Sequence, residues 1–139
     1  MAKIAICDHR SAAAVERLAS VFEARGHTVI HIFHDDPKKA SQELLSGECD
    51  VALMDLFFER RDNMKDFREW WGPCILAYTM KRPRPFSVIV YSKYVDSDMR
   101  DYLVHELGVD DKCIVPWMVR THLQLAELIE ETSSRLPRR

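Results

Sequence analysis

Short apolar runs alternate with segments of helical periodicity along this chain, and that alternation limits the fold more than any other feature. The apolar runs cover residues 3–7, 27–33, 51–54, 87–91 and 112–115. Apolar residues at helical spacing follow in 11–26, 35–47, 72–81, 95–108 and 121–136. Strands that alternate with helices form right-handed βαβ crossovers and a parallel sheet covered on both faces. The sequence therefore predicts a single α/β domain with a five-stranded parallel sheet.

Glycine and proline support these boundaries. Every glycine falls at a predicted helix border: Gly26, Gly47, Gly72 and Gly108. Two prolines, Pro37 and Pro73, lie in the first turn of a predicted helix. None of the glycines builds a G-x-G-x-x-G or G-x-x-x-x-G-K-[ST] pattern. A Rossmann or P-loop phosphate cradle is therefore not expected.

Composition and charge exclude several classes of protein. The 139 residues carry a net charge of −2, so no general basic field attracts nucleic acid or an anionic membrane. No apolar run approaches the roughly 20 residues that span a bilayer, and residues 1–8 lack the pattern of a signal peptide. A cytoplasmic location is expected. The four cysteines lack zinc-ligand spacing, so we expect free thiols that are mostly buried, with Cys74 in a helix.

Polar residues follow the predicted strands. In an open α/β sheet, ligands bind beyond the carboxyl ends of the strands, where the strand order reverses. The residues delivered there are, in strand order, Asp8 and His9; His34, Asp35 and Asp36; Asp55; Ser92 and Lys93; and Val115 and Pro116. With a strand order of 2-1-3-4-5, Asp8, Asp55 and Ser92 would share one crevice. His31 and His34 would point to opposite faces of a strand, which argues against a shared metal ion.

The chain resembles the receiver domains of two-component response regulators, the CheY-like group. The resemblance covers nearly the whole chain and depends on the order of "KIAICDH", "VALMD", "SVIVYS" and "ELGVDDKCIVPW". It implies a flavodoxin/CheY-like sheet of order 2-1-3-4-5 in one domain over 1–139. It also implies that the chain is not an enzyme beyond autocatalytic phosphoryl transfer to Asp55.

The resemblance also implies roles for the crevice residues. Asp55 would be the phospho-acceptor, Asp8 and Asp55 would bind Mg²⁺, and Ser92 would be the hydroxyl that senses the phosphoryl group. The implied partners are a histidine kinase or phosphotransfer protein and a downstream output protein or domain. A homodimer through the fourth and fifth helices is also implied. No membrane contact and no direct nucleic-acid contact are expected.

Some positions depart from the family pattern and predict an atypical member. His9 stands where a second acid is usual, which weakens the Mg²⁺ site. Val115 replaces the usual lysine and cannot pair with phosphate. Lys112 occupies the position of the usual switch aromatic and is expected on strand five, pointing away from Val115. His9 and Lys93 are accessory candidates from loops.

The segment after Asp55 is also longer than in the family. The predicted loop, 56–72, holds candidate lid or partner contacts at Phe57, Phe58, Trp70 and Trp71, and one of the two adjacent tryptophans is expected in the core. The basic connector 81–85 is expected to be a solvated loop, and 135–139 a basic tail. Two alternatives remain: a phosphorylation-independent protein-interaction or small-ligand module, and a small flavodoxin-like nucleotide-binding enzyme.

Overall fold

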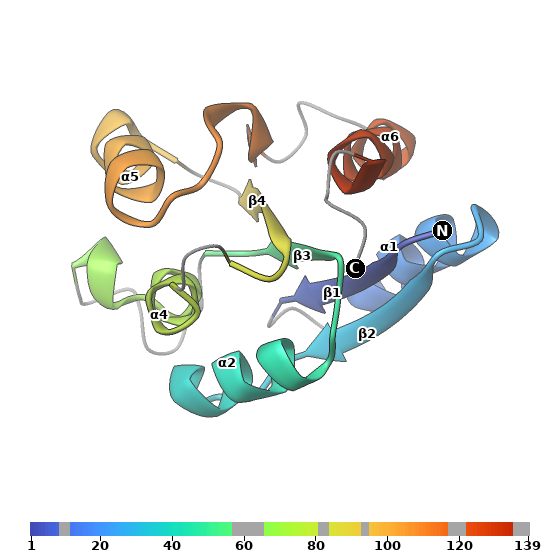
Figure 1. Cartoon of the computed structure of the whole chain (residues 1–139), viewed down its shortest axis with the longest axis horizontal. Coiled ribbons are helices and arrows are strands. Elements are labelled where there is room, and N and C mark those ends of the chain that lie inside the picture. Colours follow the sequence, from blue (N-terminus) through green and yellow to red (C-terminus); the bar gives the residue numbers. More distant parts are fainter. Residues whose placement is uncertain (9–11, 57–65, 81–83, 93–94, 117–121, 135–139) are drawn as a thin grey trace.

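The computed structural model describes residues 1–8, 12–56, 66–80, 84–92, 95–116 and 122–134. Strands and helices alternate along them (Figure 1), as the sequence predicts. The short elements η1 and η3 are 3₁₀ helices, and η2 is a π-helical turn that continues α5. The elements are β1 Lys3–Cys7, α1 Ala12–Ala24, β2 Thr28–Ile32, α2 Pro37–Ser46, β3 Val51–Met54, η1 Phe67–Glu69, α4 Trp71–Tyr78, β4 Ser87–Ser92, α5 Ser97–Asp101, η2 Tyr102–Glu106, η3 Asp111–Cys113, β5 Ile114–Pro116 and α6 His122–Ser134.

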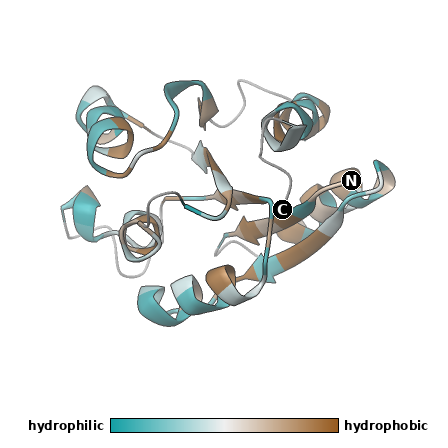
Figure 2. Cartoon of the chain, in the orientation of Figure 1, coloured by the Kyte–Doolittle hydropathy of each residue, from teal (hydrophilic) through white to brown (hydrophobic). Residues whose placement is uncertain are grey.

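The five strands form one parallel sheet of order β2-β1-β3-β4-β5, which confirms the predicted fold class and strand order. Side chains of alternating residues separate into two apolar clusters, one on each face. Helices α1 and α6 cover one face, and α2, α4 and α5 cover the other (Figure 1). Figure 2 shows hydrophobic colour gathered on the strands between these helices. Among the described residues, no helix combines the length and apolar character that crossing a bilayer requires.

Local signals account for most of the element boundaries. Asp36 caps α2 by accepting a hydrogen bond from the Lys38 amide, and Pro37 is the first helical residue, as predicted. Helix α4 starts at Trp71, one residue before the predicted segment 72–81, and Pro73 lies in its first turn, as predicted. Proline is tolerated throughout the first turn, because the amides there have no partner within the helix.

The predicted fifth strand, 112–115, is wrong at its start. Lys112 lies in η3 and is exposed, and β5 begins only at Ile114. The carboxylate of Asp110 accepts a hydrogen bond from the Lys112 amide at 3.0 Å, which turns the chain before the strand begins. The prediction that Lys112 lies on the strand and points away from Val115 is therefore wrong, because Lys112 precedes the strand.

A charged network fastens α6 to the start of β2. Glu130 of α6 accepts hydrogen bonds from Arg25 and lies 2.7 Å from Nε2 of His27. The Nδ1 atom of His27 accepts from the amide of Ala2 at 3.0 Å, so Nε2 carries the proton and donates to Glu130. The hydrogen bonds from Arg25, ahead of those from His27, lower the pKa of Glu130 from 4.5 to about 2.

The depressed pKa of Glu130 predicts a stability contribution that depends on pH. A carboxyl group whose pKa is lower in the folded state stabilises that state fully above its unfolded pKa. We expect Glu130→Gln to be less stable than the wild type at pH 6, and the difference to shrink as the pH falls from about 4.5 towards 2. Urea unfolding of both proteins at several pH values measures this. A difference that stays constant down to pH 2.5 would contradict the assignment.

Candidate functional site

The candidate site lies at the carboxyl edge of the three central strands. Cys7 of β1 pairs with Met54 of β3, so the next residues, Asp8 and Asp55, follow at the same level on neighbouring strands. The amide of Asp55 donates to the carbonyl of Cys7 at 2.9 Å, which extends the ladder past the end of β3. Neighbouring strands lie only about 5 Å apart, so two acidic residues stand side by side at this edge.

Both acidic residues are buried, with Asp8 3% exposed and Asp55 6% exposed. Oxygen ligands of this kind suit Mg²⁺, which typically takes one or two carboxylates and completes its shell with water and phosphate oxygens. The pair therefore fits a magnesium ion in its donor chemistry. The described residues contain no group of three acidic, histidine or cysteine side chains that could hold a metal ion.

Ser92 ends β4, the strand beside Asp55. Met54 pairs with Val90, so Ser92 lies one residue beyond the level of Asp55. Ser92 is 1% exposed, and strand alternation assigns its side chain to the face covered by α4 and α5. The structure thus brings Asp8, Asp55 and Ser92 to adjacent strand ends, and their chemical roles remain predictions.

Val115 of β5 lies at the same level of the sheet as the candidate site. It pairs with Tyr91, which is level with Asp55, and is only 3% exposed. It packs in the cluster under α1 and α6, on the face to which alternation assigns Asp8 and Asp55. An apolar side chain therefore stands where the resemblance expects a lysine, and Lys112 is outside the strand.

Cys7 and His31 lie next to Asp8 at this edge. Burial, ahead of the nearby Cys49 and Asp8, raises the pKa of Cys7 well above its usual value, so its thiol stays protonated. Cys7, Cys49 and Cys113 are buried thiols outside any disulfide, and Cys74 lies half-buried in α4, as predicted. His31 Nε2 lies 2.9 Å from the carbonyl of Asp8 and donates to it.

The first turn of α4 lies directly over the end of β3. A Cβ added at Gly72 would meet the carbonyl oxygen of Asp55 and the Cα of Leu56, both at 2.6 Å. Trp71 is 2% exposed, and its indole Nε1 donates to the carbonyl of His34 at 2.8 Å. Trp71 is therefore a core residue, and its assignment as a partner contact is wrong. Trp70 is half-buried, which confirms that the tryptophans divide between core and surface.

Sequence reasoning missed the role of Gly72, which it treated only as a helix border. A glycine beside a helix start is the one available signal, and it does not reveal which backbone approaches. The accessory candidates His9 and Lys93 and the loop candidates Phe57 and Phe58 lie outside the described residues.

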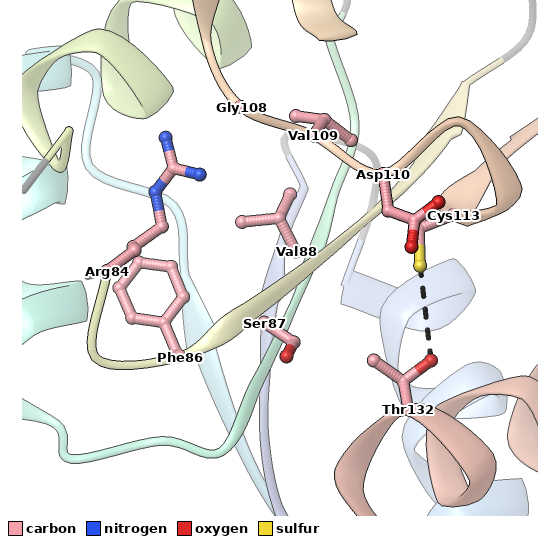
Figure 3. A pocket seen from close by; sticks show the side chains of 9 residues that line it. All are labelled: Arg84, Phe86, Ser87, Val88, Gly108, Val109, Asp110, Cys113 and Thr132. Carbon is pink, nitrogen blue, oxygen red and sulfur yellow. Dashed lines mark hydrogen bonds between the residues drawn. The ribbon is translucent and has the colours of Figure 1, made fainter. Parts of the chain in front are cut away.

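A separate pocket of about 280 Å³ opens near the start of β4, at the opposite edge of the sheet (Figure 3). Arg84 stands at one end of it, and Asp110, Cys113 and Thr132 at the other. Arg84 is half-buried, and its guanidinium donates to the carbonyls of Leu76 and Leu107 at 3.0 and 2.9 Å. This arginine of the connector 81–85 is thus a tie between two helix ends rather than a solvated residue.

Comparisons with known proteins agree with this architecture. No protein-family profile matches the chain, and no curated protein sequence matches it. Among solved structures, the receiver domain of Francisella response regulator 1452 is 18% identical, with a TM-score of 0.72 over 97% of this chain and 98% of that one.

Two further receiver structures show the same likeness. The signal receiver domain of the putative response regulator NarL from Mycobacterium tuberculosis is 15% identical, with a TM-score of 0.71 over 97% of this chain and 98% of that one. The N-terminal domain of a response regulator receiver protein from Methanoculleus marisnigri JR1 is 22% identical, with a TM-score of 0.61 over 100% and 99%. At these identities the likeness establishes the fold, which is that of response-regulator receiver domains.

Proposed function

We propose that this chain is a receiver domain of a two-component system in which Asp55 accepts a phosphoryl group. The observation that supports this most is the pairing of Cys7 with Met54, which sets Asp8 and Asp55 side by side at the carboxyl edge. Two adjacent buried acidic residues suit one nucleophile and one ion-binding group. The fold shared with the receiver structures supports the same role.

In this proposal a carboxylate oxygen of Asp55 attacks phosphorus in line with the donor's leaving oxygen. A new bond between oxygen and phosphorus forms as the bond to the leaving group breaks, and an aspartyl phosphate remains. Asp8 and Asp55 would hold Mg²⁺, which when bound offsets negative charge on the phosphoryl oxygens. Ser92 ends the neighbouring strand one residue beyond the level of Asp55, and in this proposal its hydroxyl turns over the strand ends and donates to the transferred group. No other enzymatic activity is proposed.

The partners follow from the same role. A histidine kinase or phosphotransfer protein would supply the phosphoryl group, and an output protein or domain would respond. Dimerisation through the helices on either side of β5 is part of this proposal. It is supported by Leu123 of α6, an apolar residue that is 50% exposed and that a second copy could cover. A cytoplasmic location is proposed because these partners act there.

Acetyl phosphate with Mg²⁺ tests the proposal directly. We expect intact-mass spectrometry to show the gain of one phosphoryl group on the wild type, and Asp55→Asn to lose that gain completely. Asp8→Asn should retain the acceptor but need a much higher Mg²⁺ concentration. Glu127→Gln removes an exposed charge from α6 and serves as the control with unchanged gain. An equal gain on Asp55→Asn would refute the assignment.

The buried Val115 favours one alternative, a phosphorylation-independent interaction module on the same fold. Without a lysine at this level, an aspartyl phosphate lacks one charge-assisted hydrogen bond. In this alternative the wild type gains no phosphoryl group even at high Mg²⁺ concentrations, and still binds its output partner.

A further inference from the structure

The contact between α4 and the end of β3 is a contact of backbone with backbone. Gly72 has no side chain, and a methyl group in its place would lie 2.6 Å from both the Asp55 carbonyl oxygen and the Leu56 Cα. The Gly72 amide also lies 3.4 Å from the carbonyl oxygen of Leu56. The two nearest neighbours are backbone atoms, and the Leu56 side chain comes only third at 3.2 Å, so a displacement of the backbone at Asp55 meets α4 directly.

A second anchor fixes the same helix turn to the chain that follows β2, the edge strand two places from β3 in the sheet. The buried indole of Trp71 donates to the carbonyl of His34, just past β2. Helix α4 therefore contacts the chain after β3 through Gly72 and the chain after β2 through Trp71. These two contacts determine the position of the helix start relative to Asp55.

The start of α4 is continuous with η1. Amide-to-carbonyl hydrogen bonds join Trp70 to Phe67 at 3.1 Å and Cys74 to Trp70 at 2.9 Å. These bonds link the 3₁₀ turn and the α-helix into one unit. We call residues 66–78 the η1–α4 unit.

The η1–α4 unit contacts η2 through aromatic side chains. The ring of Phe67 meets that of Tyr102 edge to face, with centroids 5.6 Å apart. The guanidinium of Arg68 lies over both rings, 4.7 Å from Phe67 and 5.3 Å from Tyr102. Asp66 binds Arg68 at 3.0 Å and holds it there. A shift of the unit would therefore change the packing of Tyr102.

Tyr102 starts an unusual stretch of helix. The amide of Leu107 donates to the carbonyl of Tyr102 at 3.1 Å, which is the hydrogen-bond pattern of a π-helical turn. Such turns are rare and occur frequently at functional sites. Tyr102 and Arg68 also line a surface groove of about 570 Å³ with Asp98, Asp101, His105 and Glu106.

On the β5 side, the two described residues to which the resemblance draws attention are Val115 and Lys112. Val115 offers only an apolar side chain at the level of Asp55, and Lys112 is exposed outside the strand. Neither residue provides an aromatic side chain that could change its position with the state of Asp55.

We infer that the state of Asp55 is transmitted through the Gly72 contact to the η1–α4 unit and on to η2, so that the surface it controls is the groove beside Tyr102. This inference rests on the proposed function where it concerns phosphorylation. The route runs from Asp55 through Gly72 to the η1–α4 unit, and the responding surface is the groove beside Tyr102.

Hydrogen–deuterium exchange on the full chain tests the route in two arms. In the first, wild type treated with acetyl phosphate and Mg²⁺ is compared with untreated protein. We expect exchange in 66–78 and in 102–106 to change by about fivefold or more, the lower range of coupling between sites. Changes confined to 114–134, with 66–78 and 102–106 unaltered, would overturn the inference and leave the acceptor role of Asp55 intact.

The second arm needs no phosphorylation. Asp55→Asn removes the charge at nearly constant shape, and Glu127→Gln does the same on the exposed face of α6. We expect Asp55→Asn to change exchange at both 66–78 and 102–106, and Glu127→Gln to change neither. If Asp55→Asn leaves 102–106 unaltered, the route is wrong. If phosphorylation fails but this arm succeeds, the proposed function falls and the route stands.

Discussion

Val115→Lys is expected to raise the rate of phosphoryl transfer from acetyl phosphate to Asp55 by about tenfold to a hundredfold. Val115 pairs with Tyr91 at the level of Asp55, and Pro116 follows it as in the receiver pattern. A lysine there would place an ammonium group on the face to which strand alternation assigns Asp55. A hydrogen bond to a charged group contributes about 1.5–3 kcal/mol, which corresponds to this range of rates.

Val115→Met is the matched control, because methionine has a similar length and no charge. Lysine at a position that is 3% exposed should also destabilise the fold, so urea unfolding must show that both variants are folded. The rate of mass gain is then compared at equal Mg²⁺ concentrations. Equal rates for the lysine and methionine variants would show that the missing ammonium group is not what limits the site.

Gly72→Ala is expected to destabilise the protein by about 1–3 kcal/mol, the usual range for forcing an extra group into a packed contact. Helix propensity alone predicts the opposite sign, because alanine is better than glycine in a helix by about 1 kcal/mol. The added methyl group would meet backbone atoms of Asp55 and Leu56 at 2.6 Å, and backbone cannot move aside as a side chain can.

Gly47→Ala provides the control for this prediction. Its Cβ would come as close as 2.8 Å to the terminal methyl group of the Ile30 side chain, and the nearest backbone atom, the Glu43 carbonyl oxygen, is 3.2 Å away rather than 2.6 Å. The φ angle of Gly47 is −72°, so alanine suits the backbone. We expect a change of less than about 1 kcal/mol for Gly47→Ala. Urea unfolding of both variants measures the difference, and equal costs would contradict the backbone contact at Gly72.

The sheet could be predicted from the sequence because its information is local. Apolar runs that end in Asp8 and Asp55 fix the strands, and the alternation with helices fixes their parallel direction. The meeting of Asp8 with Asp55 then follows from the strand order, which the resemblance supplied. The cap at Asp36 is local in the same way, since Asp36 lies next to the helix that it starts.

Other features depend on contacts between segments that are distant in sequence. Nothing beside Gly72 reveals that Asp55 and Leu56 lie against it, and Arg84 reaches the carbonyl of Leu107, 23 residues away. The prediction that Lys112 lies on the fifth strand was wrong for a different reason. The run 112–115 reads equally well as a strand or as a turn that enters a strand, and the Asp110 side chain decides for the turn.

The residue that carries the phosphoryl group decides the proposed function. After treatment with acetyl phosphate and Mg²⁺, reduction with borohydride converts an aspartyl phosphate to homoserine, and peptide mass spectrometry locates the change. We expect homoserine at position 55 and unchanged aspartate at position 8. Homoserine at position 8, or at neither position, would contradict the assignment of Asp55 as the acceptor.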